Sequence, residues 1–157
     1  MRRLRLFVYG TLQPQAGTPM ARWIAARTLR AQPASAAGRL FALRAKEGWY
    51  PALIPAHRGL AVSGMLCELV LAPGELARLD LYEGQEYRRI SQPVRTCDGR
   101  GMNAQLYSWR VALPPSRILI ADGHFLDWMR AARGEPYGSR LGIGCVRRGL
   151  AFARLSH

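Results

Sequence analysis

Residues 79–89 read LDLYEGQEYRR, and they hold the clearest signals for how the middle of this chain folds. A helix of about ten residues is predicted to begin at Pro73-Gly74-Glu75 and to end at Gly84, because glycine readily adopts the left-handed conformation that closes many helices. A strand from Arg88 to Thr96 is predicted next. The quoted stretch therefore spans the end of a helix and the start of a strand.

Glu83 is the residue of this helix that most suggests chemistry. It shares a helical face with two leucines, so it projects from the side expected to face the core, whereas Tyr82 falls on another face. It also lies at the helix C-terminus, where the macrodipole disfavours a carboxylate, with Asp80 one turn away. We expect a raised pKa, which suits a general base near neutral pH. The structural alternative is a Glu83 that turns outward and pairs with Arg88 or Arg89.

A second segment of interest is Tyr9-Gly10-Thr11-Leu12, which follows a predicted strand at residues 4–9. A strand that ends in a glycine turn exposes backbone N–H groups, and these can bind a carboxylate or stabilise an oxyanion. The alternative is an ordinary turn in which Thr11 caps its own backbone.

The remaining pattern predicts an α+β protein in which strands outnumber helices and short turns join many of them. We expect a small mixed or antiparallel β-barrel with flanking helices. The length predicts a single domain over residues 1–157, with a core at about 4–134 and a C-terminal extension at 135–157. Further strands are predicted at 38–43, 62–71 and 102–111, an extended piece at 50–55, and helices at 19–27 and 122–133.

The net charge is the unusual feature of the composition. The formal charge is +13, carried by 22 Arg and one Lys. Because the arginines are spread along the chain, we interpret them as a solvated basic surface that attracts nucleic acid weakly and without sequence preference. A basic RNA-associated protein is the alternative that this charge leaves open.

Other features predict the compartment and exclude some partners. No apolar run approaches the roughly 20 residues that cross a bilayer, so no membrane partner is expected. Cys67, Cys97 and Cys145 are widely spaced and odd in number, which indicates free thiols and a cytoplasmic location. The three histidines lack metal-ligand spacing, and no metal site is predicted.

Taken together, these motifs resemble those of the gamma-glutamylcyclotransferase-like family. The family's marks appear in order: Tyr-Gly-Thr-Leu after the first strand, Gly38-Arg39-Leu40, Val62-Ser63-Gly64, and the helix end and strand start at residues 79–89. The resemblance covers roughly residues 4–110, and it implies a small barrel-like fold with helices around it.

The resemblance also implies an enzyme that needs no cofactor. Characterised members cleave a gamma-glutamyl amine, amino acid or peptide by intramolecular attack of the α-amine on the γ-carbonyl, which yields 5-oxoproline and the released amine. By this resemblance Glu83 is the general base. Five residues match positions that bind the substrate or line its cavity: Tyr9, Gly10, Thr11, Leu12 and Tyr87. A non-catalytic ligand-binding or regulatory domain of the same fold is the alternative.

Overall fold

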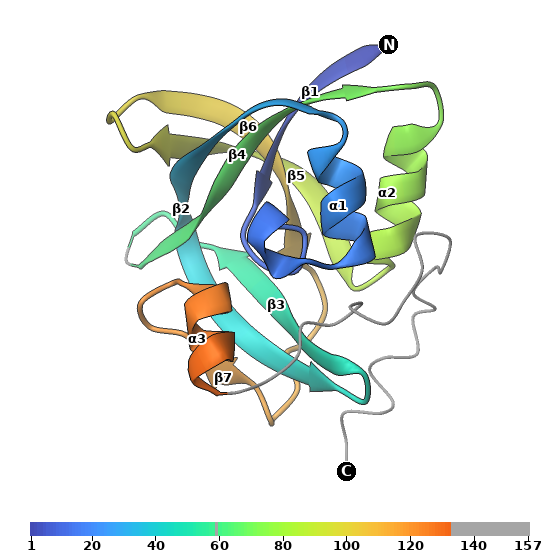
Figure 1. Cartoon of the computed structure of the whole chain (residues 1–157). Helices are drawn as coiled ribbons and strands as arrows, with labels where there is room; N and C mark the ends of the chain where they lie inside the picture. The colour runs from blue at the N-terminus through green and yellow to red at the C-terminus, as the bar shows by residue number, and fades with distance from the viewer. Residues whose placement is uncertain (59, 133–157) are drawn as a thin grey trace.

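The computed structural model describes residues 1–58 and 60–132, and it contains a closed mixed barrel (Figure 1). Five strands follow one another around the barrel in the order β2-β4-β1-β6-β5, and β5 pairs back onto β2. The β1–β6 pair is parallel, and the other pairs around the barrel are antiparallel. The predicted fold class is confirmed. The barrel strands are β1 (Arg2–Val8), β2 (Thr28–Ala45), β4 (Ala61–Leu71), β5 (Tyr87–Thr96) and β6 (Gly101–Trp109).

The longest strand, β2, differs most from the prediction, which covered only residues 38–43. Its first part, Thr28 to Ala37, pairs with β4. Its second part leaves the barrel and forms a hairpin with β3 (Gly48–Pro55), and it also pairs with β7 (Ile118–Leu119). Residues 28–37 contain mostly Ala, Arg, Gln, Pro and Ser, so their strand conformation comes from pairing with a neighbour rather than from local propensity.

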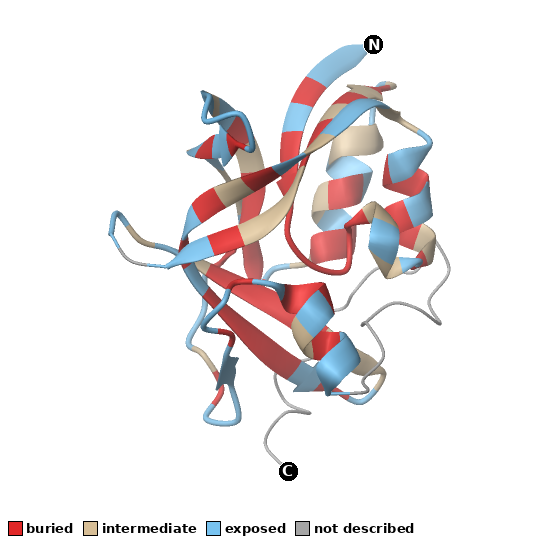
Figure 2. Cartoon of the chain, turned by 60° about the vertical axis from the view of Figure 1, so that its left-hand side comes forward, coloured by how far each residue is buried: buried red, intermediate tan, exposed pale blue. Residues whose placement is uncertain are grey.

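Two apolar cores divide the packing. One contains inward-facing residues of all five barrel strands, such as Phe7 and Leu66, which lie opposite each other on β1 and β4. Helix α3 (Phe125–Ala131) adds three buried residues to this core. The second core joins the other face of β1, β4 and β6 to α1 (Pro19–Ala25) and α2 (Glu75–Glu83). Figure 2 shows the resulting alternation of buried and exposed residues along the strands.

The helix ends follow the signals in the sequence. Thr18 caps α1 by accepting a hydrogen bond from the Ala21 N–H at 3.1 Å, and Pro19 occupies the first turn. Gly84, with φ of 84°, caps α2 and donates its N–H to the Asp80 carbonyl at 3.2 Å. Helix α3 covers Phe125–Ala131 and is shorter than the predicted helix at 122–133. Residue 133 and the predicted extension at 135–157 lie outside the described residues.

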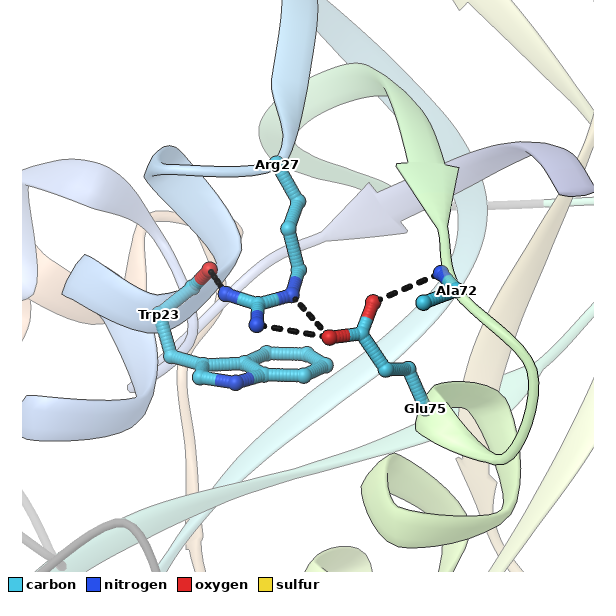
Figure 3. A network of polar contacts seen from close by, with 4 residues as sticks. All are labelled: Trp23, Arg27, Ala72 and Glu75. Atoms are coloured by element: carbon cyan, nitrogen blue, oxygen red, sulfur yellow. Dashed lines mark hydrogen bonds and ion pairs between the residues drawn. The ribbon is translucent and has the colours of Figure 1, made fainter. Parts of the chain in front are cut away.

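An ion pair fastens α2 to the end of α1 (Figure 3). The Arg27 guanidinium donates through Nε and Nη2 to Glu75 Oε1, at 2.9 and 2.7 Å, and stacks 3.8 Å above the Trp23 ring. The other carboxylate oxygen of Glu75 accepts the Ala72 N–H at 2.8 Å. Arg27 also donates to the Trp23 carbonyl at 3.0 Å. These contacts hold the first turn of α2, and hence the whole short helix, against α1.

Two expectations about membranes and cysteines can be compared with the described residues. None of the helices within 1–58 and 60–132 has the length and apolar character needed to cross a membrane. Cys67 is buried and Cys97 exposed, and both thiols are free as predicted. Burial raises the pKa of the Cys67 thiol to about 11, against a hydrogen bond from Thr28 that lowers it. Cys145 lies outside the described residues.

Candidate active site

A small pocket lies where β1 ends and the turn toward α1 begins. Every residue that the sequence singled out for catalysis or binding lines it. Glu83 comes from the last turn of α2 and Tyr87 from the first position of β5, while the turn after β1 supplies the other four. The full lining is Phe7, Val8, Tyr9, Gly10, Thr11, Leu12, Pro51, Glu83, Tyr87 and Tyr107.

Glu83 faces this pocket and is only 5% exposed. Arg88, one of its two expected outward partners, is exposed at the surface. Arg89, the other, binds Asp80 through two hydrogen bonds, Nε to Oδ1 at 2.9 Å and Nη2 to Oδ2 at 3.1 Å. The inward orientation predicted for Glu83 is therefore the one present. Tyr82, on another face of the helix, is buried as well, so the last turn of α2 packs on two sides.

The turn after β1 is held from two directions. The Gln13 N–H donates to the Gly10 carbonyl at 3.0 Å, and the Thr11 carbonyl accepts the Thr18 hydroxyl at 2.8 Å. Thr18 thus links this turn to the start of α1. Within residues 1–58 and 60–132, the N–H groups of Gly10, Thr11 and Leu12 donate to no backbone carbonyl. Sheet pairing of β1 ends before them, at Val8.

Gly10 is required by close packing rather than by an unusual φ. A Cβ at this position would lie 2.1 Å from Cγ of Pro51, a distance that non-bonded carbon atoms do not reach. Since both residues line the pocket, the turn after β1 and strand β3 touch here. The Tyr87 hydroxyl donates to the Pro51 carbonyl and ties the start of β5 to the same place.

Tyr107, on β6, also lines the pocket, and no role was predicted for it from the sequence. Its hydroxyl donates to Asp80 Oδ1 at 2.7 Å, and its carbonyl accepts the Tyr9 hydroxyl. Burial raises the pKa of Tyr107, and the hydrogen bond to Asp80 and the charge of Glu83 raise it further, so the phenol stays neutral. The sequence indicated one part of this contact, since Asp80, which accepts the Tyr107 hydrogen bond, precedes Glu83 by one helical turn. Tyr107 itself reaches the site only through strand pairing.

Asp80 forms the centre of a charged network behind the pocket. Burial alone would raise its pKa, but hydrogen bonds from Arg89 and Tyr107, together with nearby guanidinium charge, lower the pKa below its ordinary value. Asp80 is therefore a firmly ionised acceptor that holds Tyr107 in place. Arg89 extends the network to Gln105 on β6.

The pocket is narrow as it stands. The space inside is about 20 Å³, room for about one water molecule. Among the described residues, no group of His, Cys, Asp and Glu is arranged to hold a metal ion. The chemistry available in the pocket is thus that of one carboxylate, a set of backbone N–H donors and three tyrosines.

The closed mixed barrel with its flanking helices has the gamma-glutamylcyclotransferase-like fold. The chain belongs to the gamma-glutamyl cyclotransferase, AIG2-like family, whose model matches residues 6–128. This confirms the resemblance found in the sequence. No curated protein sequence matches the chain.

Solved structures agree with this assignment. The chain is similar to At5g39720.1 from Arabidopsis thaliana, with 26% identity, a TM-score of 0.60 and coverage of 85% of each chain. It is also similar to a mouse (Mus musculus) AIG2-like protein, with 22% identity, a TM-score of 0.55 and coverage of 73% of this chain and 82% of that one. A gamma-glutamyl cyclotransferase matches at 16% identity with a TM-score of 0.50, over 69% and 68% of the two chains. The last two likenesses concern the fold alone.

Proposed function

We propose that this chain is a cofactor-independent cyclotransferase that releases 5-oxoproline from a gamma-glutamyl amine, amino acid or peptide, with Glu83 as general base. One observation carries the proposal: a buried carboxylate shares a pocket with Gly10, Thr11 and Leu12, whose N–H groups donate to no backbone carbonyl among the described residues. A carboxylate and a set of fixed donors are what this reaction requires, because one must accept a proton while the other stabilises negative charge.

The reaction uses the two parts in turn. Glu83 takes a proton from the substrate's α-ammonium and leaves a neutral amine. The amine nitrogen attacks the γ-carbonyl carbon, and the negative charge that forms on oxygen is stabilised by N–H groups of Gly10, Thr11 and Leu12. The tetrahedral intermediate then collapses, the C–N bond to the leaving amine breaks, and Glu83 gives the proton that it holds to that amine. The new ring nitrogen passes its extra proton to the freed Glu83 carboxylate, which leaves the lactam N–H of 5-oxoproline, and Glu83 then releases this proton to the departing amine or to water. Ring closure is intramolecular, so the protein contributes mainly by holding the substrate in a folded conformer with the amine close to the γ-carbonyl carbon.

The aromatic walls determine access. A pocket of about 20 Å³ is far below the roughly 300 Å³ or more of typical ligand sites. Substrate entry therefore requires part of the wall to move. Tyr9 and Tyr107 are joined to each other and to Asp80, and we expect them to stay in place.

The test is a substrate panel with a matched pair of variants. Purified protein is incubated with gamma-glutamyl amino acids, gamma-glutamyl amines and glutathione, and 5-oxoproline is detected. Formation of 5-oxoproline by the wild type and by Glu47→Gln, a change in the β2–β3 turn, but not by Glu83→Gln supports the proposal. Absence of turnover across the panel, with saturable binding of the same compounds, would favour the non-catalytic ligand-binding or regulatory domain. The cytoplasmic location and the lack of a specific nucleic-acid partner stay predictions.

A further inference from the structure

A serine, a histidine and an aspartate lie together where β4 begins, beside the start of α3 (Figure 1). The Oγ atom of Ser63 lies 3.3 Å from Nε2 of His124, and Nδ1 of His124 lies 3.9 Å from Oδ2 of Asp127. The imidazole ring therefore stands between a hydroxyl and a carboxylate, with one ring nitrogen toward each. This is the order of groups that activates a serine hydroxyl as a nucleophile.

The backbone contacts between β4 and the segment before α3 fix the relative position of the serine and the histidine. The Ser63 N–H donates to the carbonyl of Gly123, the residue that precedes His124, at 2.9 Å. A Cβ at Gly123 would lie 2.0 Å from the Ala61 carbonyl oxygen, and the φ of 73° at this position also favours glycine. Ser63 and His124 thus come from two segments that touch through their backbones.

These side chains line an open cavity of about 340 Å³, which we call the Ser63 cavity. It shares no lining residue with the Glu83 pocket. Its volume lies within the range of small-molecule sites. Part of the lining is apolar and comes from Pro33, Ala34, Phe125 and Leu126. An apolar wall beside a nucleophile suits the hydrocarbon part of a short acyl group, because burying that part is favourable.

A buried amide in the Ser63 cavity supplies a donor of the kind that acyl transfer requires. Gln13 lines the cavity and is only 8% exposed. Within residues 1–58 and 60–132 its side chain forms no hydrogen bond, so the amide N–H groups are available to a ligand. A fixed N–H donor stabilises the negative charge that develops on oxygen when a nucleophile attacks a carbonyl group.

We propose that Ser63 and His124, with Asp127 as the positioning residue, form a second active site that hydrolyses esters of short acyl groups. Asp127 holds the histidine tautomer in which Nε2 is free to accept a proton. The 3.9 Å between His124 and Asp127 exceeds a hydrogen bond, so the ring must approach the carboxylate by about 1 Å when substrate binds, and catalytic contacts in free enzymes often shorten in this way.

The reaction runs through an acyl-serine. His124 Nε2 takes the Ser63 hydroxyl proton while Oγ bonds to the acyl carbon, and the Gln13 amide donates to the oxyanion. The C–O bond to the leaving alcohol then breaks, and His124 gives its proton to the alcohol oxygen. Water next attacks the acyl carbon and passes a proton to His124. When this second intermediate collapses, the carboxylic acid leaves and the proton returns to the Ser63 oxygen.

The other interpretation of these contacts is structural. The His124 side chain is 49% exposed, and Asp127 also accepts a hydrogen bond from Nη1 of Arg130 at 3.4 Å. On this interpretation the contact of His124 with Ser63 only holds the start of α3 against β4. The two interpretations differ in reactivity, because a structural serine reacts with electrophiles no faster than other exposed serines, whereas an activated serine reacts selectively.

The experiment combines labelling of the full chain by a fluorophosphonate, mapped by mass spectrometry, with initial rates of 4-nitrophenyl acetate hydrolysis. We expect one label per chain, on Ser63, and its loss in His124→Ala. Hydrolysis above the buffer blank should fall roughly 100-fold or more in Ser63→Ala and in His124→Ala. Ser91→Ala and His57→Ala are the matched controls, since both remove exposed residues of the same types outside the cavity. They should keep both the label and the rate.

Asp127→Asn tests the positioning role. We expect kcat for the ester to fall roughly tenfold or more with KM little changed, because the amide cannot stabilise the charged imidazole. A merely structural Asp127 would change the melting temperature without changing kcat.

Three results would overturn the proposal: a label spread over several serines, an equal rate in Ser63→Ala and the wild type, or an equal loss of rate in the controls Ser91→Ala and His57→Ala. If Ser63→Ala or His124→Ala fails to fold, as judged by circular dichroism, the position of the label in the wild type decides the question.

Discussion

The two ends of β1 contrast in almost every physical property. At its C-terminal end the Glu83 pocket is buried, holds about 20 Å³ of space and has mainly aromatic and backbone walls. At its N-terminal end β1 separates from β6, and the cleft between them, the β1–β6 cleft, holds about 440 Å³ and has Arg2, Arg3 and Arg5 in its lining. The first exists because several elements converge on one turn. The second exists because two strands of the barrel stop pairing.

The difference shows that the contacts of one strand decide how open its surroundings are. Where β1 is fastened on all sides, each neighbour restricts what fits, as Pro51 does at Gly10. Where β1 is paired on one side only, the side chains of Arg2, Arg3 and Arg5 are exposed. A chain of hydrogen bonds connects the two regions, from Gln105 through Arg89 and Asp80 to Tyr107.

The largest effect is expected for Glu83→Gln. The change keeps the size of the side chain but removes the proton acceptor, so turnover should fall by roughly two to four orders of magnitude. Thermal stability should hold or rise slightly, since a carboxylate at a helix C-terminus is disfavoured by the macrodipole. Initial rates of 5-oxoproline formation and the melting temperature are measured on the same preparation. A variant that keeps more than about a tenth of the wild-type rate would remove Glu83 from the role of base.

Gly10→Ala tests the close packing that keeps this pocket small. The new methyl group meets the Pro51 ring at 2.1 Å, so the turn after β1 or strand β3 must shift. We expect a loss of roughly 1–3 kcal/mol in the free energy of unfolding, typical of overpacking, and a marked loss of turnover. The matched control is Gly101→Ala at the start of β6, where an added Cβ meets nothing within 4 Å. Equal stability of both variants in urea denaturation would contradict the packing argument.

A feature of the pocket could be predicted from the sequence only where neighbouring residues along the chain determine it. The helix ending at Glu83 carries its own start and stop signals, and the turn after β1 is marked by Gly10. Both were therefore located from the sequence. Tyr107 joins the pocket through the pairing of β1 with β6, and such contacts between distant segments leave no local pattern. The β1–β6 cleft went unpredicted for the same reason, since it arises where pairing is missing.

Strand β2 and the end of α2 illustrate two further limits. Residues 28–37 have weak strand propensity, and their pairing with β4 and β5 makes them a strand, so the prediction began at Gly38. Tyr82 was assigned to a different face from the leucines and Glu83, and it is buried as well. An assignment of helical faces assumes that only one face of a helix packs against the protein, whereas two faces of the last turn of α2 are buried.

Glu75→Gln tests whether the position of the Glu83 helix depends on its link to α1. The hydrogen bonds from Arg27, and then that from Ala72, lower the pKa of Glu75. A carboxyl whose pKa is lowered on folding stabilises the protein above its unfolded pKa of about 4.3, and this stabilisation is lost as the pH falls. The variant should therefore melt a few degrees below the wild type at pH 7, and the gap should close toward pH 3. Glu68→Gln, whose partner Arg5 is 3.7 Å away and half exposed, is the control and should change little at either pH.

The smallest effect is expected for Tyr107→Phe, which breaks the chain of hydrogen bonds between the two regions at one atom. Asp80 loses the donor at 2.7 Å but keeps Arg89, so the free energy of unfolding should fall by about 1 kcal/mol or less. Because the Tyr107 hydrogen bond helps to lower the pKa of Asp80, removing it should move that pKa upward.

The measurement is an NMR titration of the Asp80 carboxyl in both proteins. In Tyr107→Phe the pKa of Asp80 lies nearer its unfolded value of about 3.9, so the ionised carboxylate stabilises the fold less. The free energy of unfolding should therefore be lower than in the wild type above about pH 3.9, and this difference should shrink as the pH falls below that value. Arg89→Ala, which removes two hydrogen bonds to the Asp80 carboxylate together with a positive charge, should raise the pKa of Asp80 more than Tyr107→Phe does. An Asp80 titration that is identical in wild type and Tyr107→Phe would mean that the phenol does not act on Asp80, and the two regions would then be independent.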